Sequence, residues 1–206
     1  MLNTVSFGFL ILLIALLYLG VLERVLERMR LSGRQAFLVL AAIIIGGLLP
    51  DIPLVQGLKI NLGGMLIPLL VVFYLLVTAD RREEKYRALF AALVTGLVCR
   101  AADHLLPANP GIGFFDIDPL VLPALIAAPV AYILGRSRRS AFCGAFLGVL
   151  LVELLAWGEN LRRGLGAASF VLGGGGFWAA ALFAGVLAVL LAEAVGEIRE
   201  RLHRGG

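Results

Sequence analysis

A single carboxylate stands alone inside one of the long apolar stretches of this chain. Glu153 is the only charged residue between Phe146 and Trp157. A carboxylate in such a segment costs several kcal/mol unless it is paired or protonated. Glu153 is therefore a candidate proton carrier or cation ligand. The alternatives are a structural ion pair, for which Arg100 is the cationic residue expected at a similar depth, and a neutral carboxyl bonded to a backbone carbonyl.

A second polar group ends another apolar stretch, in Arg100-Ala-Ala-Asp103-His104. Asp103 and His104 follow Arg100 by three and four residues, so the three side chains lie on nearly the same helix face. Such a group could bind an ion, a proton or an anionic ligand. The alternative is a local salt bridge at the end of a helix.

Two glycine-rich stretches predict irregular backbone. In Asn61-Leu-Gly63-Gly64-Met-Leu-Ile-Pro68 the proline lacks an amide donor and the glycines weaken a helix. Irregular backbone at membrane depth is tolerated where it is buried in protein or lines a cavity. One interpretation is a broken helix at 61–68 whose backbone groups face a ligand, as in many transporters. The other is an ordinary helix start with Asn61 as its cap.

The second such stretch is an uninterrupted run of four glycines, Gly173, Gly174, Gly175 and Gly176. Each glycine costs about 1 kcal/mol relative to alanine inside a helix. The run therefore predicts a broken helix at 173–176, a helix that starts only after it, or a glycine face packed against a neighbouring helix.

The elements that must position these groups are membrane spans. Of the 206 residues, 61% are hydrophobic and the mean hydropathy is +0.98, whereas a soluble domain is about 45–50% apolar. Most apolar stretches reach the roughly 17–25 residues that cross a bilayer. The sequence therefore predicts an all-α polytopic membrane protein with about seven transmembrane helices in one integral membrane domain, 1–206. The expected spans are 4–22, 35–50, 62–79, 87–106, 119–135, 141–158 and 168–194.

The basic residues predict the orientation, because 14 of the 18 fall on alternate connections and on the C-terminal tail. The exceptions are Lys59, Arg100, Arg162 and Arg163. The positive-inside rule then places the N-terminus outside and the C-terminus in the cytoplasm, in the inner (plasma) membrane of the cell. Since the polar and glycine-rich groups all fall in the outer half, a site is expected to open outward.

The net charge of +4 lies beside apolar spans, so we expect anionic lipid headgroups at the cytoplasmic loops as partners, and no nucleic acid. Cys99 and Cys143 fall inside apolar stretches at different depths, which predicts two buried thiols rather than a disulfide. Small residues four apart predict close helix packing and leave a homo-oligomer open. These pairs are Ala92/Gly96, Gly144/Gly148 and Ala181/Gly185.

Three stretches resemble a family of uncharacterised bacterial and archaeal membrane proteins, the domain of unknown function 1614 (DUF1614). They are Ile60–Pro68, Ala101–Leu106 and Leu172–Trp178. The resemblance implies a multi-pass membrane protein and carries no activity. In that family the glycine run resembles Gly-Gly-x-Gly-x-Phe-Asp, and this chain has Trp178 where the aspartate would stand. Intramembrane aspartyl proteases need two carboxylates that share a proton, so only Glu153 could join Asp103 in such a pair.

We interpret the chain as a non-enzymatic membrane protein that binds or passes a small polar solute, an ion or a lipid headgroup. The alternatives are an intramembrane aspartyl-protease-like hydrolase, active or not, and a scaffold for a partner protein. No catalytic triad, zinc motif or phosphate loop occurs in the sequence, so no catalytic residue, metal or cofactor is predicted. The candidate binding residues are Asn61, Gly63, Gly64, Arg100, Asp103, His104, Glu153, Gly173, Gly174, Gly175 and Gly176.

Overall fold

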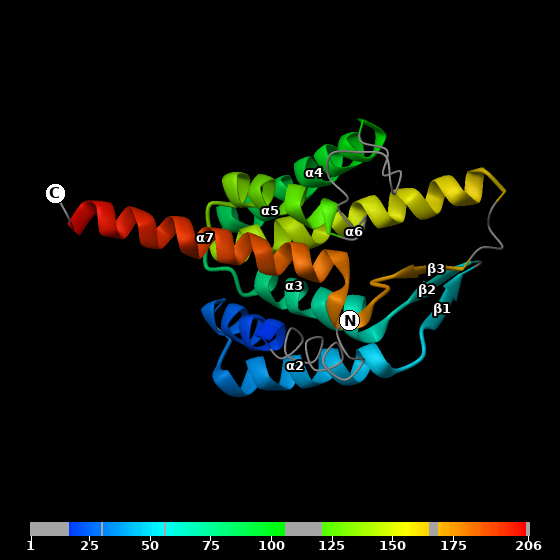
Figure 1. The fold of residues 1–206 in the computed structure, drawn as a ribbon, viewed down its shortest axis with the longest axis horizontal. Helices are drawn as coiled ribbons and strands as arrows, with labels where there is room; N and C mark the ends of the chain where they lie inside the picture. Colours follow the sequence, from blue (N-terminus) through cyan, green and yellow to red (C-terminus); the bar gives the residue numbers. More distant parts are fainter. Residues whose placement is uncertain (1–16, 30, 56, 106–120, 165–168, 205–206) are drawn as a thin grey trace, which may run out of the picture.

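The computed structural model describes residues 17–204 except 30, 56, 106–120 and 165–168, and it consists mainly of helices (Figure 1). Residues 17–28 are helical and precede the other elements, so the first predicted span, 4–22, lies mostly outside the described residues. The elements that follow are α2 (Gly33–Leu48), β1 (Ile52–Val55), β2 (Leu58–Ile60), η1 (Leu62–Leu66), α3 (Ile67–Val77), α4 (Arg82–Leu105), α5 (Leu122–Gly135), α6 (Arg138–Arg162), β3 (Phe170–Leu172), η2 (Gly176–Trp178) and α7 (Ala180–Arg204).

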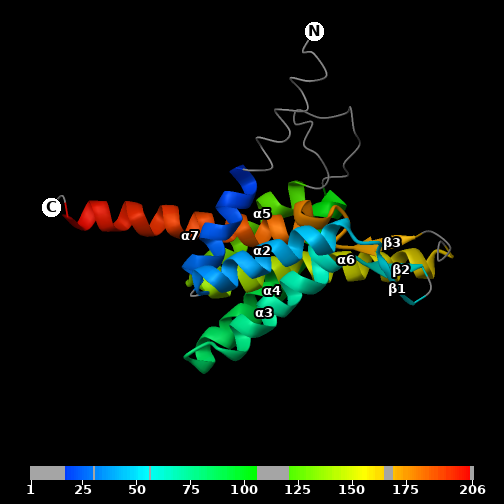
Figure 2. The same ribbon diagram turned by 90° about the horizontal axis from the view of Figure 1, so that it is seen from below.

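The helices run between two distinct ends of the molecule (Figures 1 and 2). The end of helix 17–28, the start of α2, the connections around 78–81 and 136–137 and the end of α7 lie at one end, which we call the arginine end. The strands and the end of α6 lie at the other, which we call the sheet end. The alternate connections that carry most of the basic residues thus lie together at one end of the folded chain.

Helix α6 is central, because α4, α5 and α7 all pack against it. Glycines allow this close approach. A Cβ atom on Gly148 of α6 would lie 2.7 Å from Cγ2 of Thr95 on α4, and one on Gly144 would lie 2.8 Å from Cβ of Ala91. A Cβ on Gly185 of α7 would lie 2.8 Å from the ring of Phe142. The small-residue pairs predicted from the sequence are thus helix-packing faces within the chain.

Three of the described helices are long and apolar enough to cross a membrane: α4, α6 and residues Ala180–Ile198 of α7. The apolar helices of Gly33–Leu48, Leu62–Val77 and Leu122–Gly135 are shorter. A helix needs roughly 20 residues to cross the hydrocarbon core of a bilayer, which these three do not reach. The lengths therefore indicate a membrane protein with three candidate spans among the described residues, and the count of seven stays a prediction.

Large apolar side chains on the outer faces of the helices fit a membrane protein. Phe37 of α2, Phe73 of α3 and Phe90 of α4 are each more than half exposed. Soluble proteins rarely leave large continuous apolar patches open to water, whereas lipid accepts them. The interior, by contrast, is closely packed and includes both cysteines, which are buried and unpaired.

The expectation of an all-α fold missed a small sheet at the sheet end. The strands have the order β1-β2-β3, with β1 antiparallel to β2 and β2 parallel to β3. All three strands are short and mostly apolar. Periodicity alone does not distinguish a short buried strand from a piece of helix. The turn at Gly57, with φ of 71°, closes the hairpin of β1 and β2.

The start predicted for the last span was therefore wrong. The sequence placed it at 168, which lies outside the described residues, but the segment from Phe170 to Leu172 is β3 and α7 begins at Ala180. Gly173 has a φ of +68° and Gly175 a φ of +97°, and Gly176 is left-handed as well. Glycine favours this region of backbone conformation, and a right-handed helix cannot run through it.

The predicted break at 61–68 is a local change of helix type. Residues Leu62–Leu66 form a single π-helical turn that continues directly into α3, and Pro68 lies in the first turn of α3. Pro68 has no amide to donate to the α-helical hydrogen bonds, and it stands where the π-helical turn passes into α3. The irregular backbone is thus a wide turn, and the helix is continuous.

Candidate functional site

Three backbone segments meet with no side chains between them at the sheet end. We call this contact the glycine junction (Gly47, Gly63, Gly64, Gly173 and Gly176). A Cβ on Gly63 would lie 2.0 Å from the carbonyl oxygen of Ile43, and one on Gly64 would lie 2.1 Å from that of Gly173. Close packing of this kind accounts for glycine at 63, 64 and 173, whereas Gly176 is required by its left-handed backbone, with φ of +60°.

The two middle glycines of the run lie beside this contact. A Cβ on Gly174 would make only ordinary contacts of 3.4 Å or more, and Gly175 is exposed with φ of +97°. Gly175 is therefore required by the turn, and Gly174 is the position of the run that would accept a side chain most easily.

Asn61 ties the glycine junction to its neighbours. It is 6% exposed, and its Oδ1 atom accepts a hydrogen bond of 2.8 Å from the amide of Gly64. Its Nδ2 group donates to Oδ1 of Asp51 at 2.9 Å, and its own amide donates to the carbonyl of Leu172 at 3.0 Å. The side chain is thus engaged as the cap of the π-helical turn, which is the ordinary role predicted for it.

Glu153 faces the glycine junction from α6. It is partly buried, and its Oε2 atom accepts a hydrogen bond of 3.3 Å from the amide of Gly173. The proposed pairing with Arg100 is wrong, because Arg100 contacts Glu159 and lies 3.9 Å from Asp103. Glu153 and Glu159 are six residues apart and so point about a third of a turn away from each other around α6. Only Glu159 faces α4.

The group of Arg100, Asp103 and His104 therefore lies at the end of α4. Arg100 also has a partner on another helix, Glu159 of α6. The side chain of Arg100 is 18% exposed, while those of Asp103 and Glu159 are 38% and 40% exposed. His104 is exposed as well. Arg100 thus joins the ends of α4 and α6 through charges that water reaches. This interhelical pair could not be read from the sequence, since it joins residues 59 positions apart.

We expect Glu153 to be replaceable by glutamine but not by leucine. Glu153→Gln keeps an oxygen that accepts from Gly173 and removes a charge, so its thermal unfolding midpoint in detergent should equal or exceed that of the wild type. Glu153→Leu leaves the Gly173 amide without an acceptor, which costs about 1–3 kcal/mol. Equal unfolding midpoints for the leucine and glutamine variants would show that the hydrogen bond contributes nothing.

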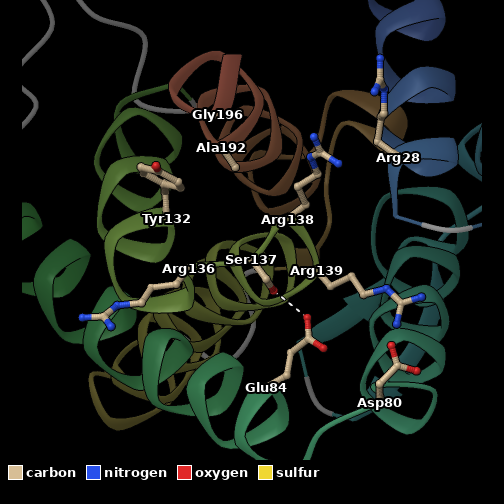
Figure 3. A pocket seen from close by; sticks show the side chains of 10 residues that line it. All are labelled: Arg28, Asp80, Glu84, Tyr132, Arg136, Ser137, Arg138, Arg139, Ala192 and Gly196. Carbon is tan, nitrogen blue, oxygen red and sulfur yellow. Dashed lines mark hydrogen bonds between the residues drawn. The ribbon is translucent and has the colours of Figure 1, made fainter. Parts of the chain in front are cut away.

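A cavity of about 380 Å³ lies at the arginine end (Figure 3). We call it the arginine pocket. Residues of helix 17–28, the α3–α4 connection, α4, α5, the α5–α6 connection, α6 and α7 all contribute to it, so four separate stretches of the sequence converge there. Its lining residues are Arg28, Asp80, Glu84, Tyr132, Arg136, Ser137, Arg138, Arg139, Ala192 and Gly196.

The short turn between α5 and α6, together with the first two residues of α6, supplies three of the four arginines in the arginine pocket. Arg136 ends α5 in the left-handed conformation, with φ of 57°, which turns the chain sharply before α6. Ser137 caps α6 by accepting from the amide of Ser140, and its hydroxyl donates to Oε1 of Glu84 at 2.6 Å (Figure 3). This bond fixes the turn against α4.

The lining contains four arginines and two carboxylates, so the arginine pocket is positively charged. The Nε atom of Arg139 donates to the carbonyl of Met29 at 3.2 Å, and Nη1 donates to that of Thr78 at 3.4 Å. The Nε atoms of Arg28 and Arg138 lie 3.3 and 3.4 Å from Oε1 of Glu193. Because a guanidinium has five N–H donors, most donors of these arginines are not used by these contacts.

Sequence reasoning used these arginines to orient the chain and expected anionic lipid headgroups beside the cytoplasmic loops, but it did not predict a pocket. The signal that could have found the pocket is that alternate connections must meet at one end of a helical bundle, where Gly135-Arg-Ser-Arg-Arg-Ser140 is the densest basic run. Among the described residues, no group of three His, Cys, Asp or Glu side chains is placed to hold a metal ion. The arrangement at the arginine end is chemically that of an anion site.

A protein-family model described as "Protein of unknown function (DUF1614)" matches residues 12–191. The three stretches on which the resemblance to this family was based all fall within that range. No curated protein matches the chain, and no solved structure matches it.

Proposed function

The chain belongs to the DUF1614 family of proteins of unknown function, and from that premise we propose that it is a non-enzymatic membrane protein that binds a small anion in the arginine pocket. One observation carries this proposal: four arginines from three segments line a cavity of about 380 Å³. Small-molecule sites commonly enclose about 300–1,000 Å³. The volume is therefore enough for a phosphate or carboxylate group with a short substituent.

Arginine is suited to this ligand class because its planar guanidinium offers two parallel donors to a phosphate or carboxylate. Arg28 and Arg138 are the expected ligands, since their side chains are 61% and 45% exposed. Arg139 donates hydrogen bonds to two backbone carbonyls, so we expect it to add positive charge to the site without contacting the ligand directly. Arg136 extends its guanidinium away from Ser137 and Arg138 (Figure 3), so we expect little contribution from it.

The positive-inside rule supports a cytoplasmic location for the arginine end, in a multi-pass protein of the plasma membrane. We therefore propose that the anion enters from the cytoplasm, at the opposite end from the outward-opening site predicted from the sequence. Headgroups of anionic lipids and small phosphorylated solutes are both present at that surface. They share the phosphate group that the arginines would recognise.

The test is phosphate binding by the purified protein in neutral detergent. Inorganic phosphate should bind to the wild type in isothermal titration calorimetry and raise its unfolding midpoint. Arg138→Gln removes charge-assisted hydrogen bonds of about 1.5–3 kcal/mol, so affinity should fall roughly 10- to 100-fold. The matched control is Arg87→Gln at the same end, because Arg87 lies outside the pocket and pairs with Glu83 on its own helix. An equal loss in both variants, or a wild type that binds neither inorganic phosphate nor phosphatidylglycerol headgroups, would contradict the proposal.

A second candidate function is the binding or passage of a small polar solute or ion at the sheet end. The observation that favours it is Glu153, whose carboxylate lies within a candidate span and contacts the Gly173 amide. Ionisable residues in membrane spans often mark such routes. Glu153→Gln should then abolish solute binding or uptake while leaving the unfolding midpoint unchanged. The hydrolase alternative has less support, since Asp103 is beside Arg100 and Glu153 faces Gly173.

A further inference from the structure

Glu193 of α7 lies between two arginines of the pocket. Its Oε1 atom is 3.3 Å from Nε of Arg28 and 3.4 Å from Nε of Arg138, and its side chain is 27% exposed. Its neighbours along α7, Ala192 and Gly196, line the pocket itself. One carboxylate oxygen thus links helix 17–28, α6 and α7 at the position where an anionic ligand would contact the same guanidinium groups.

The two arginines neutralise the charge of Glu193 but do not form well-aligned hydrogen bonds with it. Oε1 of Glu193 is buried, yet it accepts no hydrogen bond from the described residues, although two guanidinium groups lie within 3.4 Å. Both ion pairs are made through Nε. A bidentate pair would also use an Nη donor, which is the stronger arrangement for arginine. The carboxylate is therefore an imperfect partner for Arg28 and Arg138.

A phosphate group would be a better partner. It carries a charge of about −1.5 to −2 near neutral pH when it is a monoester, and three acceptor oxygens. It can contact two guanidinium groups at once, whereas Glu193 is fixed to α7 and offers them a single oxygen. The exposure of Arg28 and Arg138 gives these side chains room to turn toward a ligand in the cavity.

We propose that Glu193 is an internal competitor of the ligand: it holds Arg28 and Arg138 when the pocket is empty, and a phosphate group displaces it. This inference rests on the proposed function, because it assumes that the arginine pocket binds anions. Displacement breaks the ion pair between helix 17–28 and α7. The helix stays packed through Leu22, Val25 and Leu26, which are at most 1% exposed, so the expected change is local loosening.

Competition has a measurable cost in affinity. A ligand that must displace Glu193 binds with an apparent affinity lowered by the fraction of molecules in which the arginines are free. Glu193→Gln removes the competing charge and should raise the affinity for inorganic phosphate roughly 3- to 10-fold. The matched control is Glu27→Gln, which makes the same change in net charge at an exposed acidic residue of helix 17–28. Its affinity should stay within about twofold of wild type, as expected for a screened surface charge.

Hydrogen exchange supplies a readout that general electrostatics would not move. Phosphate should speed amide exchange in residues 17–28 of the wild type, because it releases Arg28 from Glu193. In Glu193→Gln the exchange should already be fast, and phosphate should not change it. Protection of residues 17–28 by phosphate in the wild type would overturn the inference, as would equal affinities of Glu193→Gln and Glu27→Gln.

The outcomes separate this inference from the proposed function. If Arg138→Gln loses phosphate binding while Glu193→Gln matches the wild type, the pocket binds anions and the competition is refuted. Two probes test the anion site itself: inorganic phosphate, and nanodiscs of equal parts phosphatidylglycerol and phosphatidylcholine. If the wild type binds neither probe more tightly than Arg138→Gln does, the anion site is refuted. A gain for Glu193→Gln with inorganic phosphate supports a free phosphorylated solute. The same gain confined to the phosphatidylglycerol nanodiscs supports a lipid headgroup.

Discussion

Gly64→Ala should prevent this protein from reaching its folded state. The added Cβ would lie 2.1 Å from the carbonyl oxygen of Gly173 and 2.6 Å from that of Gly176. Both atoms belong to backbone, so no side-chain rotation relieves the overlap. Gly173 is in turn confined by Met65, whose amide and Cβ lie 2.7 Å from a Cβ placed there. We expect a loss of more than about 4 kcal/mol, at the upper end for single substitutions.

The measurement is the thermal unfolding midpoint of the detergent-solubilised protein, with the yield of monodisperse material as a second readout. The matched control is Gly158→Ala on α6, where nothing lies within 4 Å of the added atom. Alanine favours a helix over glycine by about 0.5–1 kcal/mol, so this control should be neutral or more stable. If Gly64→Ala is as stable as Gly158→Ala, the close approach at the glycine junction is wrong.

The second large effect is expected at the contact of α4 with α6. A Cβ on Gly148 would lie 2.7 Å from Cγ2 and 2.8 Å from Cβ of Thr95. Gly148→Ala should therefore push the two helices apart and cost about 2–3 kcal/mol, as overpacking usually does. Unlike the glycine junction, this contact involves a side chain, so a second substitution can restore the space.

A double-mutant cycle with Thr95→Gly checks that origin. Thr95→Gly alone should be destabilising, because it removes a fully buried side chain and because glycine is a weaker helix former than threonine. With Gly148→Ala added, the further loss should be small, so the coupling energy should reach roughly 1–2 kcal/mol in favour of the double variant. Strict additivity of the two unfolding free energies would mean that Gly148 and Thr95 do not press on each other.

Composition was sufficient to predict the long helices, because their apolar runs are long. The spans predicted at 87–106 and 141–158 correspond to α4 (Arg82–Leu105) and α6 (Arg138–Arg162). The structure extends α6 to Arg138 because Ser137 caps it there. Hydropathy finds the apolar middle of a helix and misses its polar ends, which a cap can keep helical.

The sheet and the arginine pocket were not predictable in the same way, because both depend on contacts between distant residues. Leu58 pairs with Phe170, and Arg28 meets Glu193. In the sequence each of these residues stands in an ordinary loop or helix end. The glycines were predictable in part. The sequence indicated their irregular backbone, but it did not show whether they face a ligand or one another, because that depends on which segments come together.

The parallel pairing of β2 with β3 sets the order in which the chain can be completed. Leu58–Ile60 emerge from the ribosome more than a hundred residues before their partners, Phe170–Leu172. Until then the edge of β2 that pairs with β3 and the bare backbone of Gly64 have nothing to cover them. Such long-range pairings form slowly and leave unpaired edges exposed to aggregation. A chain whose synthesis stops before Gly176 would therefore keep these backbone groups exposed. Pairing of the last segment is thus the step that separates the nascent chain from the folded protein.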